Sequence, residues 1–317
     1  MQAKEAPGAV QHAEHEITVS APADRVYALI ADVQKWPQLF GPTIHAEQVE
    51  LDGQSEQIRI WATANETAKT WTSRRRLDPA ARTIEFRQER SQHPVGGMGG
   101  TWAIEPLADA ECNVRLSHDY FAATDDPADL DWIAKAVDRN STVELQALKS
   151  AAEADDARTL LTFADTVEVN GAAADVYDFI NEADQWEKRL PHVLRVNLRE
   201  DEPGLQILEM DTRAGDGSVH TTRSVRICEP PHEIRYKQVV LPGLLTLHTG
   251  RWLIEERAPS LVSVTSEHTI RIDESRITAI LGEDADLAAA QAFVRRALSG
   301  NSLATLEHAK AHAERAR

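Results

Sequence analysis

The chain has 317 residues, a hydrophobic content of 42%, a charged content of 27% and a formal net charge of −17. This length allows two domains with cores of their own, and the negative charge argues against nucleic acid or a membrane surface as a partner. Two cysteines, Cys112 and Cys228, form neither a metal-ligand spacing nor a disulfide framework, and they fit a reducing cytoplasm. Residues 1–16 lack an apolar signal segment and are predicted to be a short disordered tail.

Each half of the chain predicts the same series of elements. A strand (residues 16–20 and 165–169) precedes a helix, in which Val26, Leu29 and Ile30 recur at helical spacing. A tryptophan-bearing turn follows, then several alternating strands, and a long amphipathic helix closes the half. This series predicts an α+β helix-grip fold, in which a curved antiparallel sheet wraps around a long C-terminal helix and encloses an internal cavity.

The two halves are copies of one domain. ITVSAPADRVYALIADVQKWP (17–37) parallels VEVNGAAADVYDFINEADQWE, which lies 150 residues later. The same offset pairs other residues: Leu77 with Ile227, Phe86 with Tyr236, Trp102 with Trp252, and His118 with His268. Two copies of this size indicate a duplicated domain rather than a solenoid.

The offset grows to 161 near the ends, where NSTVELQALK (140–149) matches NSLATLEHAK (301–310). About eleven residues are therefore inserted in the second copy, around RITAILGED. We predict two tandem helix-grip domains, residues 1–156 and 157–317.

The stretch TWTSRRRLD (70–78) carries the first candidate site residues. In a strand Trp71, Ser73 and Arg75 share one face, and the apolar Trp71 favours that face as the inner one. Arg75 is then either a cation inside a pocket or one half of a structural ion pair.

His118 and Asn140 are the next candidates. His118 alternates with the apolar residues of VRLSHDYF and is expected to point inward, either as a satisfied core histidine or as an acid/base group. Asn140 is placed on the buried stripe of the closing helix, where its amide needs a backbone or ligand partner. Three tryptophans, Trp36, Trp71 and Trp102, are expected either to form flat apolar walls around a planar ligand or to belong to the hydrophobic core.

Seven segments of the first half together resemble a known family. In chain order they are ADRVYALIADVQKWPQLF, IRIWATAN, WTSRRRLDP, FRQE, MGGTW, HDYF and VDRNS. They are similar to the aromatase/cyclases of bacterial type II polyketide synthases, and the tandem repeat is similar to the didomain subgroup. The resemblance implies a START/Bet v 1-like fold. It also implies aldol closure of the first ring of a carrier-bound poly-β-ketone, followed by dehydrative aromatisation. For the didomain subgroup it implies ring closure between carbons 7 and 12, or aromatisation of a ring already closed there.

The resemblance also implies roles for individual residues. Arg75 falls on the essential pocket arginine of the family, with Ser73 and Trp71 beside it, while Trp36 and His118 fall on pocket positions. We predict Arg75, His118 and Ser73 as catalytic. The substrate-binding residues are predicted to be Trp36, Trp71, Trp102, Asn140 and, from the glycine-rich stretch 93–100, Met98. A tyrosine that some relatives carry is absent at Thr43.

No metal or redox cofactor is implied, since aldol closure and dehydration need none. The expected partners are an acyl carrier protein and other subunits of the synthase, and no nucleic acid or membrane; the sequence sets no oligomeric state. The alternatives are a non-catalytic carrier of hydrophobic ligands and a structural subunit of the synthase.

The second copy predicts a pocket with Trp186, His268 and Asn301. The offset of 150 places Val225 opposite Arg75, so the key arginine is expected to be missing there. Arg223, two residues earlier on the same predicted face, is expected to point into this second pocket instead. Arg75 and His118 are therefore expected to carry the principal chemistry, while the second copy mainly supports or positions the first. The second copy is a degenerate structural partner, a second pocket for a later dehydration, or a platform for other synthase subunits.

Overall fold

The computed structural model describes residues 9–64, 67–91, 93–154, 158–213 and 217–315. Contacts divide the chain into two compact units at residues 155–156. The domain boundary predicted after residue 156 falls outside the described residues and stays a prediction.

Each unit contains one antiparallel sheet of seven strands. The strand orders are β1-β7-β6-β5-β4-β3-β2 and β8-β14-β13-β12-β11-β10-β9. The strands of the first sheet are β1 (Gln11–Val19), β2 (Thr43–Asp52), β3 (Ser55–Ala64), β4 (Thr67–Asp78), β5 (Thr83–Gln88), β6 (Val95–Ala108) and β7 (Glu111–Ala122). Those of the second are β8 (Leu160–Val169), β9 (Val193–Glu202), β10 (Leu205–Arg213), β11 (Val219–Glu229), β12 (Glu233–Val240), β13 (Leu245–Ala258) and β14 (Leu261–Ile272).

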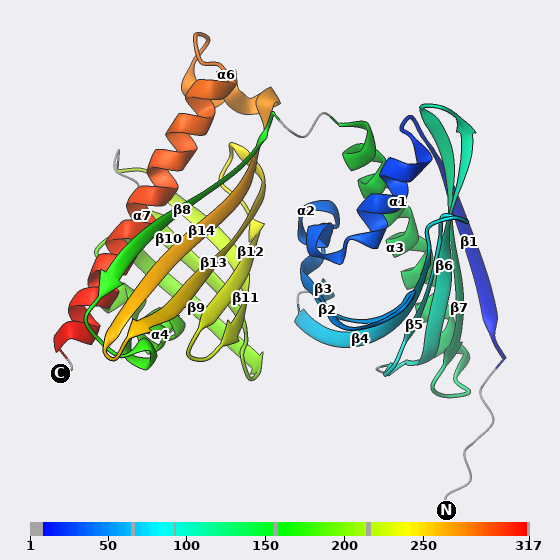
Figure 1. The fold of residues 1–317 in the computed structure, drawn as a ribbon, viewed down its shortest axis with the longest axis horizontal. Coiled ribbons are helices and arrows are strands. Elements are labelled where there is room, and N and C mark those ends of the chain that lie inside the picture. Colours follow the sequence, from blue (N-terminus) through cyan, green and yellow to red (C-terminus); the bar gives the residue numbers. More distant parts are fainter. Residues whose placement is uncertain (1–8, 65–66, 92, 155–157, 214–216, 316–317) are drawn as a thin grey trace, which may run out of the picture. The chain divides into compact units, whose positions relative to one another are not determined.

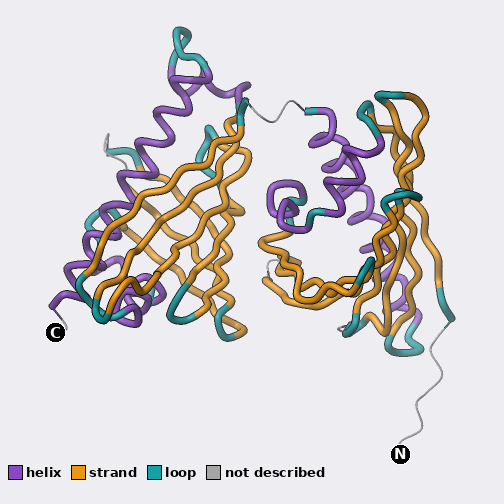
Figure 2. The backbone as a smooth tube through the Cα atoms, in the orientation of Figure 1, coloured by secondary structure: helices purple, strands orange, loops and turns teal. Residues whose placement is uncertain are grey.

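The helices lie on the concave side of these sheets (Figures 1 and 2). The first unit has α1 (Ala23–Ala31), α2 (Trp36–Leu39) and the long α3 (Pro127–Glu153), with the 3-10 turn η1 (Val33–Lys35). The second has α4 (Ala173–Asn181), α5 (Trp186–Arg189), α6 (Ile277–Leu281) and the long α7 (Leu287–Arg315), with η2 (Ala183–Gln185) and η3 (Glu274–Arg276). The α3 helix packs on β1 and β7, and α7 packs on β8 and β14. The predicted tandem helix-grip architecture is confirmed.

The first strand begins earlier than predicted. Residues Gln11 to Glu16, expected in a disordered tail, belong to β1, which pairs with β7 from Gln11↔Tyr120 to Val19↔Cys112. The strand carries mostly polar side chains and only Val19 is fully buried, so the segment lacks the apolar signal of a core strand. Its backbone pairing, rather than apolar burial, holds it in the sheet.

Helix α3 starts where its sequence provides a cap. The Asp126 side chain accepts a hydrogen bond from the backbone N–H of Ala128, and Pro127 occupies the first turn. The residues buried along α3 recur at intervals of three and four: Ile133, Val137, Ser141, Leu145, Leu148 and Ala152. This face turns toward the sheet, and the small Ser141 lies within it.

The insertion predicted around RITAILGED lies between β14 and α7. There the chain forms η3 and α6 before the long helix begins, whereas only residues 123–126 join β7 to α3 in the first unit. The apolar side chain of Ile277 anchors α6 in a cluster with Ile272 and Ala290. The added segment is therefore held against the end of the sheet and the start of α7.

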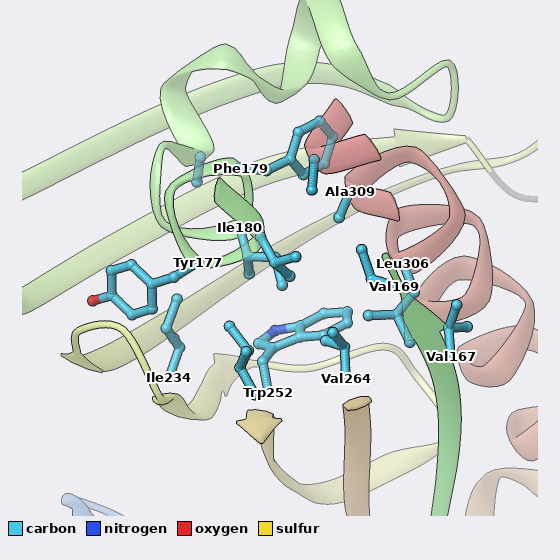
Figure 3. Close-up of a cluster of buried hydrophobic side chains, with 14 of the residues drawn as sticks. Val167, Val169, Tyr177, Phe179, Ile180, Ile234, Trp252, Val264, Leu306 and Ala309 are labelled. Carbon is cyan, nitrogen blue, oxygen red and sulfur yellow. The ribbon is translucent and has the colours of Figure 1, made fainter. Parts of the chain in front are cut away.

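Trp102 and Trp252 lie in the apolar cores of the two units. In Figure 3, Trp252 lies among Ile180, Val264 and Leu306. Trp102, 6% exposed, packs in the first unit with an equivalent set of aliphatic side chains that includes Ile30. Trp102 thus lies in the core, and its role as a substrate-binding wall stays a prediction.

Candidate active site

Arg75 points inward, as the strand pattern predicts. Ser73 and Arg75 are 4% and 3% exposed, whereas Arg74 and Arg76 on the other face of β4 are exposed. The Arg75 guanidinium donates through Nε to the Glu56 carboxylate at 2.7 Å and pairs with the same carboxylate through a second nitrogen. A buried ion pair therefore fixes the arginine.

The guanidinium also meets the end of α1. Its two terminal nitrogens donate to the backbone carbonyls of Ile30 at 2.9 Å and Ala31 at 2.7 Å. These carbonyls lie at the C-terminus of α1, where they lack helical partners and the helix dipole is negative. Burial lowers the pKa of Arg75, and the Glu56 carboxylate counteracts this effect.

One N–H of Arg75 has no partner among the described residues. A guanidinium has five N–H donors, and the two carboxylate bonds and two carbonyl bonds take four of them. Both sequence interpretations of Arg75 thus meet here, because it is an inward cation and also half of an ion pair. The sequence analysis missed Glu56, although its alternation with Ile58 and Ile60 in β3 places it on the inner face.

One tryptophan lies against this arginine. The Arg75 guanidinium lies over the Trp36 ring, 5.2 Å from its centre, and the Trp36 indole N–H donates to the carbonyl of Ile30 at 3.1 Å. Trp71 is half-buried and packs against an apolar cluster of η1, β2 and β3 that includes Val33 and Ile60. The substrate-binding role of both rings stays a prediction.

Arg75 and His118 lie in one row across the sheet. The registers pair Arg75 with Phe86, Phe86 with Gly100, and Gly100 with His118. Three strand spacings of about 4.8 Å put about 14 Å between the two backbones. Phe86 lies between them, with its ring edge-on to His118 at 5.5 Å. A Cβ at Gly100 would lie only 2.7 Å from this ring, so the absence of a side chain at this position makes room for Phe86.

His118 faces the long helix. Its Nδ1 is 3.4 Å from Oγ of the buried Ser141 on α3. Burial lowers the pKa of His118 to about 4, with a smaller contribution from nearby His15, so the imidazole is neutral at pH 7. One turn after Ser141 on the same helix face lies the half-buried Glu144. Burial raises the pKa of its carboxyl to about 7.

Asn140 does not lie on the buried stripe. It is exposed, and Ser141 occupies the inner position that the sequence analysis gave to Asn140. The helical spacing from Ile133 and Val137 identifies Ser141 as the next inward residue, since intervals of four keep one face. Met98, also predicted to line the pocket, is half-buried and packs against the cluster of Tyr120, Ile133 and Val137.

The second unit does contain the arginine that the repeat alignment predicted to be missing. Arg226 is 2% exposed, donates to the backbone carbonyl of Ile180 at 2.7 Å, and lies 5.4 Å from the ring centre of Trp186. Arg75 makes the same two contacts with Ile30 and Trp36. The prediction of a valine at this position is therefore wrong.

The error comes from a shift of one residue within β11. Arg226 pairs with Tyr236, as Arg75 pairs with Phe86, so the offset is 151 at the arginine although it is 150 on the neighbouring strand. The turn from Asp78 to Thr83 is one residue longer than the turn from Glu229 to Glu233. A turn that differs in length moves the register of the preceding strand, which a gap-free alignment does not allow.

Two other predictions for the second pocket are wrong. Arg223 lies on the outer face of β11, where it pairs with Glu209 at 2.8 Å. Asn301 is exposed on α7, and its neighbour Ser302 is the buried residue. Ser302 corresponds to Ser141, because its Oγ lies 2.8 Å from Nε2 of His268.

His268 and Trp186 are buried, as predicted, and His268 belongs to a polar cluster that the sequence analysis did not foresee. The row Arg226, Tyr236, Gly250, His268 repeats the row of the first unit. Nδ1 of His268 lies 3.0 Å from the Tyr236 hydroxyl and 2.9 Å from Nε2 of His248. Burial lowers the pKa of His248 to about 3 and that of His268 to about 4, so both are neutral at pH 7.

Comparisons with known proteins cover both units. Models of two families, each described as "Polyketide cyclase / dehydrase and lipid transport", match residues 10–153 and 169–293. The granaticin polyketide synthase bifunctional cyclase/dehydratase of Streptomyces virginiae is 49% identical over 92% of this chain and 96% of its own. The actinorhodin counterpart of Streptomyces coelicolor is 42% identical over 94% and 96%.

Solved structures agree with these relatives. The crystal structure of the di-domain ARO/CYC BexL from the BE-7585A biosynthetic pathway has a TM-score of 0.89 and 54% identity, over 96% of this chain and 99% of that one. The di-domain ARO/CYC StfQ from the steffimycin pathway has a TM-score of 0.85 and 35% identity, over 96% and 99%. The chain belongs to the di-domain aromatase/cyclase family.

The first sheet of this aromatase/cyclase carries two hollows on its outer face. One of about 380 Å³ is lined by residues that include His12, Glu14, Ser117, His118 and Asp119, and one of about 270 Å³ by residues that include Arg74, Arg75 and Arg87. Ser117 and Asp119 flank His118 and so point away from α3. The hollows therefore lie behind the row of Arg75 and His118. No helix in the described part of the aromatase/cyclase is both long and apolar enough to cross a membrane.

Proposed function

We propose that this aromatase/cyclase closes the first ring of a carrier-bound poly-β-ketone between carbons 7 and 12, and then aromatises it by dehydration. The relatives named above are bifunctional cyclase/dehydratases of polyketide synthases, which supports both steps. The observation that carries the proposal is the buried Arg75, which is fixed by Glu56 and α1 and has one N–H without a partner among the described residues.

This N–H stabilises the charge that develops in ring closure. A proton leaves the carbon between two carbonyls, the resulting enolate carbon attacks a distant carbonyl carbon, and that carbonyl oxygen becomes an alkoxide. A donor held in place before the reaction stabilises this oxygen without reorganising, and removal of one such donor typically costs about 3–4 kcal/mol. Trp36 and Trp71 restrict the chain to conformations that can react.

The proton carrier best matched to neutral pH is Glu144. An acid/base group works best when its pKa lies near the working pH, and the pKa of Glu144 is about 7. His118, with a pKa near 4, is a weak base and acts as a neutral hydrogen-bonding group. In dehydration the Glu144 carboxylate takes a proton from the ring carbon next to the alcohol carbon and returns it to the hydroxyl, which then leaves as water.

The substrate is delivered by an acyl carrier protein, and other synthase subunits are further partners. Carrier proteins are typically acidic, so docking needs local positive charge on this chain of net charge −17. Arg74 and Arg76 are exposed, yet each lies beside carboxylates: Arg74 by Glu50 and Glu89, and Arg76 by Glu85. They are therefore weak docking candidates. The free Cys112 and Cys228 fit the cytoplasm as the location.

The test is a reconstituted minimal synthase with and without this protein, followed by identification of the products. Arg75→Lys should lose most of the correctly closed product, because an ammonium lacks the planar fork that binds Glu56 and the substrate together. Arg74→Ala, on the outer face of the same strand, is the matched control and should yield normal product. Normal product from a folded Arg75→Lys protein would favour a non-catalytic carrier instead.

A further inference from the structure

The two buried arginines differ in their counter-charge. Arg75 pairs with Glu56, whereas the second unit has Gln206 at the matching place on β10, 2% exposed. The described residues give Arg226 one hydrogen bond, to Ile180, and its buried Nη1 nitrogen has no partner. A cation that is bonded to a carboxylate in the first unit thus lacks a directly bonded carboxylate in the second, where Glu200 acts on it only through space.

A buried, unpaired guanidinium is unfavourable, because it has lost its water without gaining an anion. Glu200, whose carboxylate acts on Arg226 through space, is exposed and accepts hydrogen bonds from Gln206 at 2.8 Å and from the backbone N–H of Gly204 at 2.7 Å. Burial lowers the pKa of Arg226, and no described acidic side chain bonds to it. The site is therefore prepared for a negative group from outside the chain.

Neutral polar groups lie beside this cation. Tyr236 is the cross-strand neighbour of Arg226, and its hydroxyl points at His268. A Cβ at Gly250 would lie 2.5 Å from that hydroxyl, so the glycine makes room for the contact. The first unit has Phe86 and Met98 where this unit has Tyr236 and His248. The second site is thus more polar and also lacks a carboxylate bonded to its arginine.

We infer that the second unit is a separate binding site, in which Arg226 binds the anionic oxygen of a planar, oxygen-rich ring and Tyr236 and the histidines hydrogen-bond to its other oxygens. The ring class, an enolised or aromatised polyketide, rests on the proposed function; the requirement for an anion rests on Arg226 and Gln206 alone. Buried His248 adds a second unpartnered nitrogen to this cluster, Nδ1 of its ring, beside the unpartnered Nη1 of Arg226.

The test is calorimetric titration of the whole protein with 3-hydroxy-2-naphthoate, a planar ring that carries a carboxylate and a hydroxyl. We expect one site per chain and clearly weaker binding of the uncharged 2-naphthol. Arg226→Gln should weaken binding of the naphthoate roughly tenfold or more, because it removes a charged hydrogen bond. Arg223→Gln, which changes a half-buried arginine on the outer face of the same strand, is the control and should bind as the parent does.

Gln206→Glu is the decisive variant, since it gives Arg226 the internal counter-ion that Arg75 has. It should also weaken binding roughly tenfold or more while keeping the fold, because the new carboxylate pairs with the guanidinium and competes with the ligand. The reciprocal Glu56→Gln should create a second anion site in the first unit. Unchanged affinity in folded Arg226→Gln and Gln206→Glu proteins would overturn the inference. A failed cyclisation assay would leave this binding result intact, so the two proposals fail separately.

Discussion

The Arg75 guanidinium and the Glu56 carboxylate depend on each other, because each is buried and each neutralises the other. Arg75→Gln should lower the free energy of unfolding of the first unit by about 3–5 kcal/mol, since it leaves Glu56 buried without a counter-ion. The double variant Arg75→Gln/Glu56→Gln should recover much of this loss. Urea unfolding of the single and double variants checks it, with Arg74→Gln as the exposed control. Additive effects of the two substitutions would contradict the pair.

Glu144 makes a stability prediction that depends on pH. Its folded-state pKa of about 7 lies above the ordinary 4.5, so the folded protein binds more protons than the unfolded chain in that window. Stability from this group is therefore present at low pH and lost as the pH rises from 4.5 to 7. Glu144→Gln should raise the free energy of unfolding by about 1–3 kcal/mol at pH 8 and leave it unchanged at pH 4.

The comparison at each pH is between variant and parent, so the opposite contribution of His118 cancels. The folded-state pKa of His118 is lowered to about 4, so its contribution to stability falls as the pH drops below about 6.5. Glu105→Gln, an exposed carboxylate on β6, should change stability little at either pH. An equal gain from Glu144→Gln at pH 4 and pH 8 would show that the carboxyl carries no burial penalty.

At the scale of single elements, the helical phase of α3 turns Ser141 inward and turns Asn140, the residue that the sequence analysis chose, toward solvent. Ser141→Leu should destabilise the protein by about 1–3 kcal/mol, because the position is buried against His118 and has no room for a larger side chain. Asn140→Ala should change stability by less than about 0.5 kcal/mol, since the amide is exposed. Chemical denaturation of both variants measures this difference. A larger loss for Asn140→Ala would restore the sequence-based assignment.

Strand alternation predicted which side chains of the site face inward, which is all that a local sequence pattern can predict. It placed Ser73, Arg75 and His118 inward, because one apolar neighbour on a strand sets the face of all residues two positions away. The partners of Arg75 could not be reached this way, because Glu56 and the carbonyls of α1 meet it only after β3, β4 and the helix assemble. Arg226 was missed for a related reason, since the length of a single turn set its register.

At the scale of the whole molecule, the internal repeat predicted the architecture well, because two similar apolar patterns must form two similar cores. The same similarity misled the comparison of the two sites. Conserved apolar positions align the copies, yet Glu56 against Gln206 and Phe86 against Tyr236 change the charge and polarity of the interior without disturbing that pattern. Sequence similarity between the units therefore reports their fold better than their chemistry.

Each unit should fold without the other. Each has a seven-stranded sheet, a long helix on its concave face and an apolar core cluster of its own. A domain of about 150 residues buries about 68–70% of its unfolded surface, which suffices for independent stability. Residues 1–155 and 156–317, expressed separately, should each show one cooperative thermal transition by circular dichroism. Binding of a hydrophobic dye or a transition without cooperativity in either piece would show that its core is incomplete and depends on the other unit.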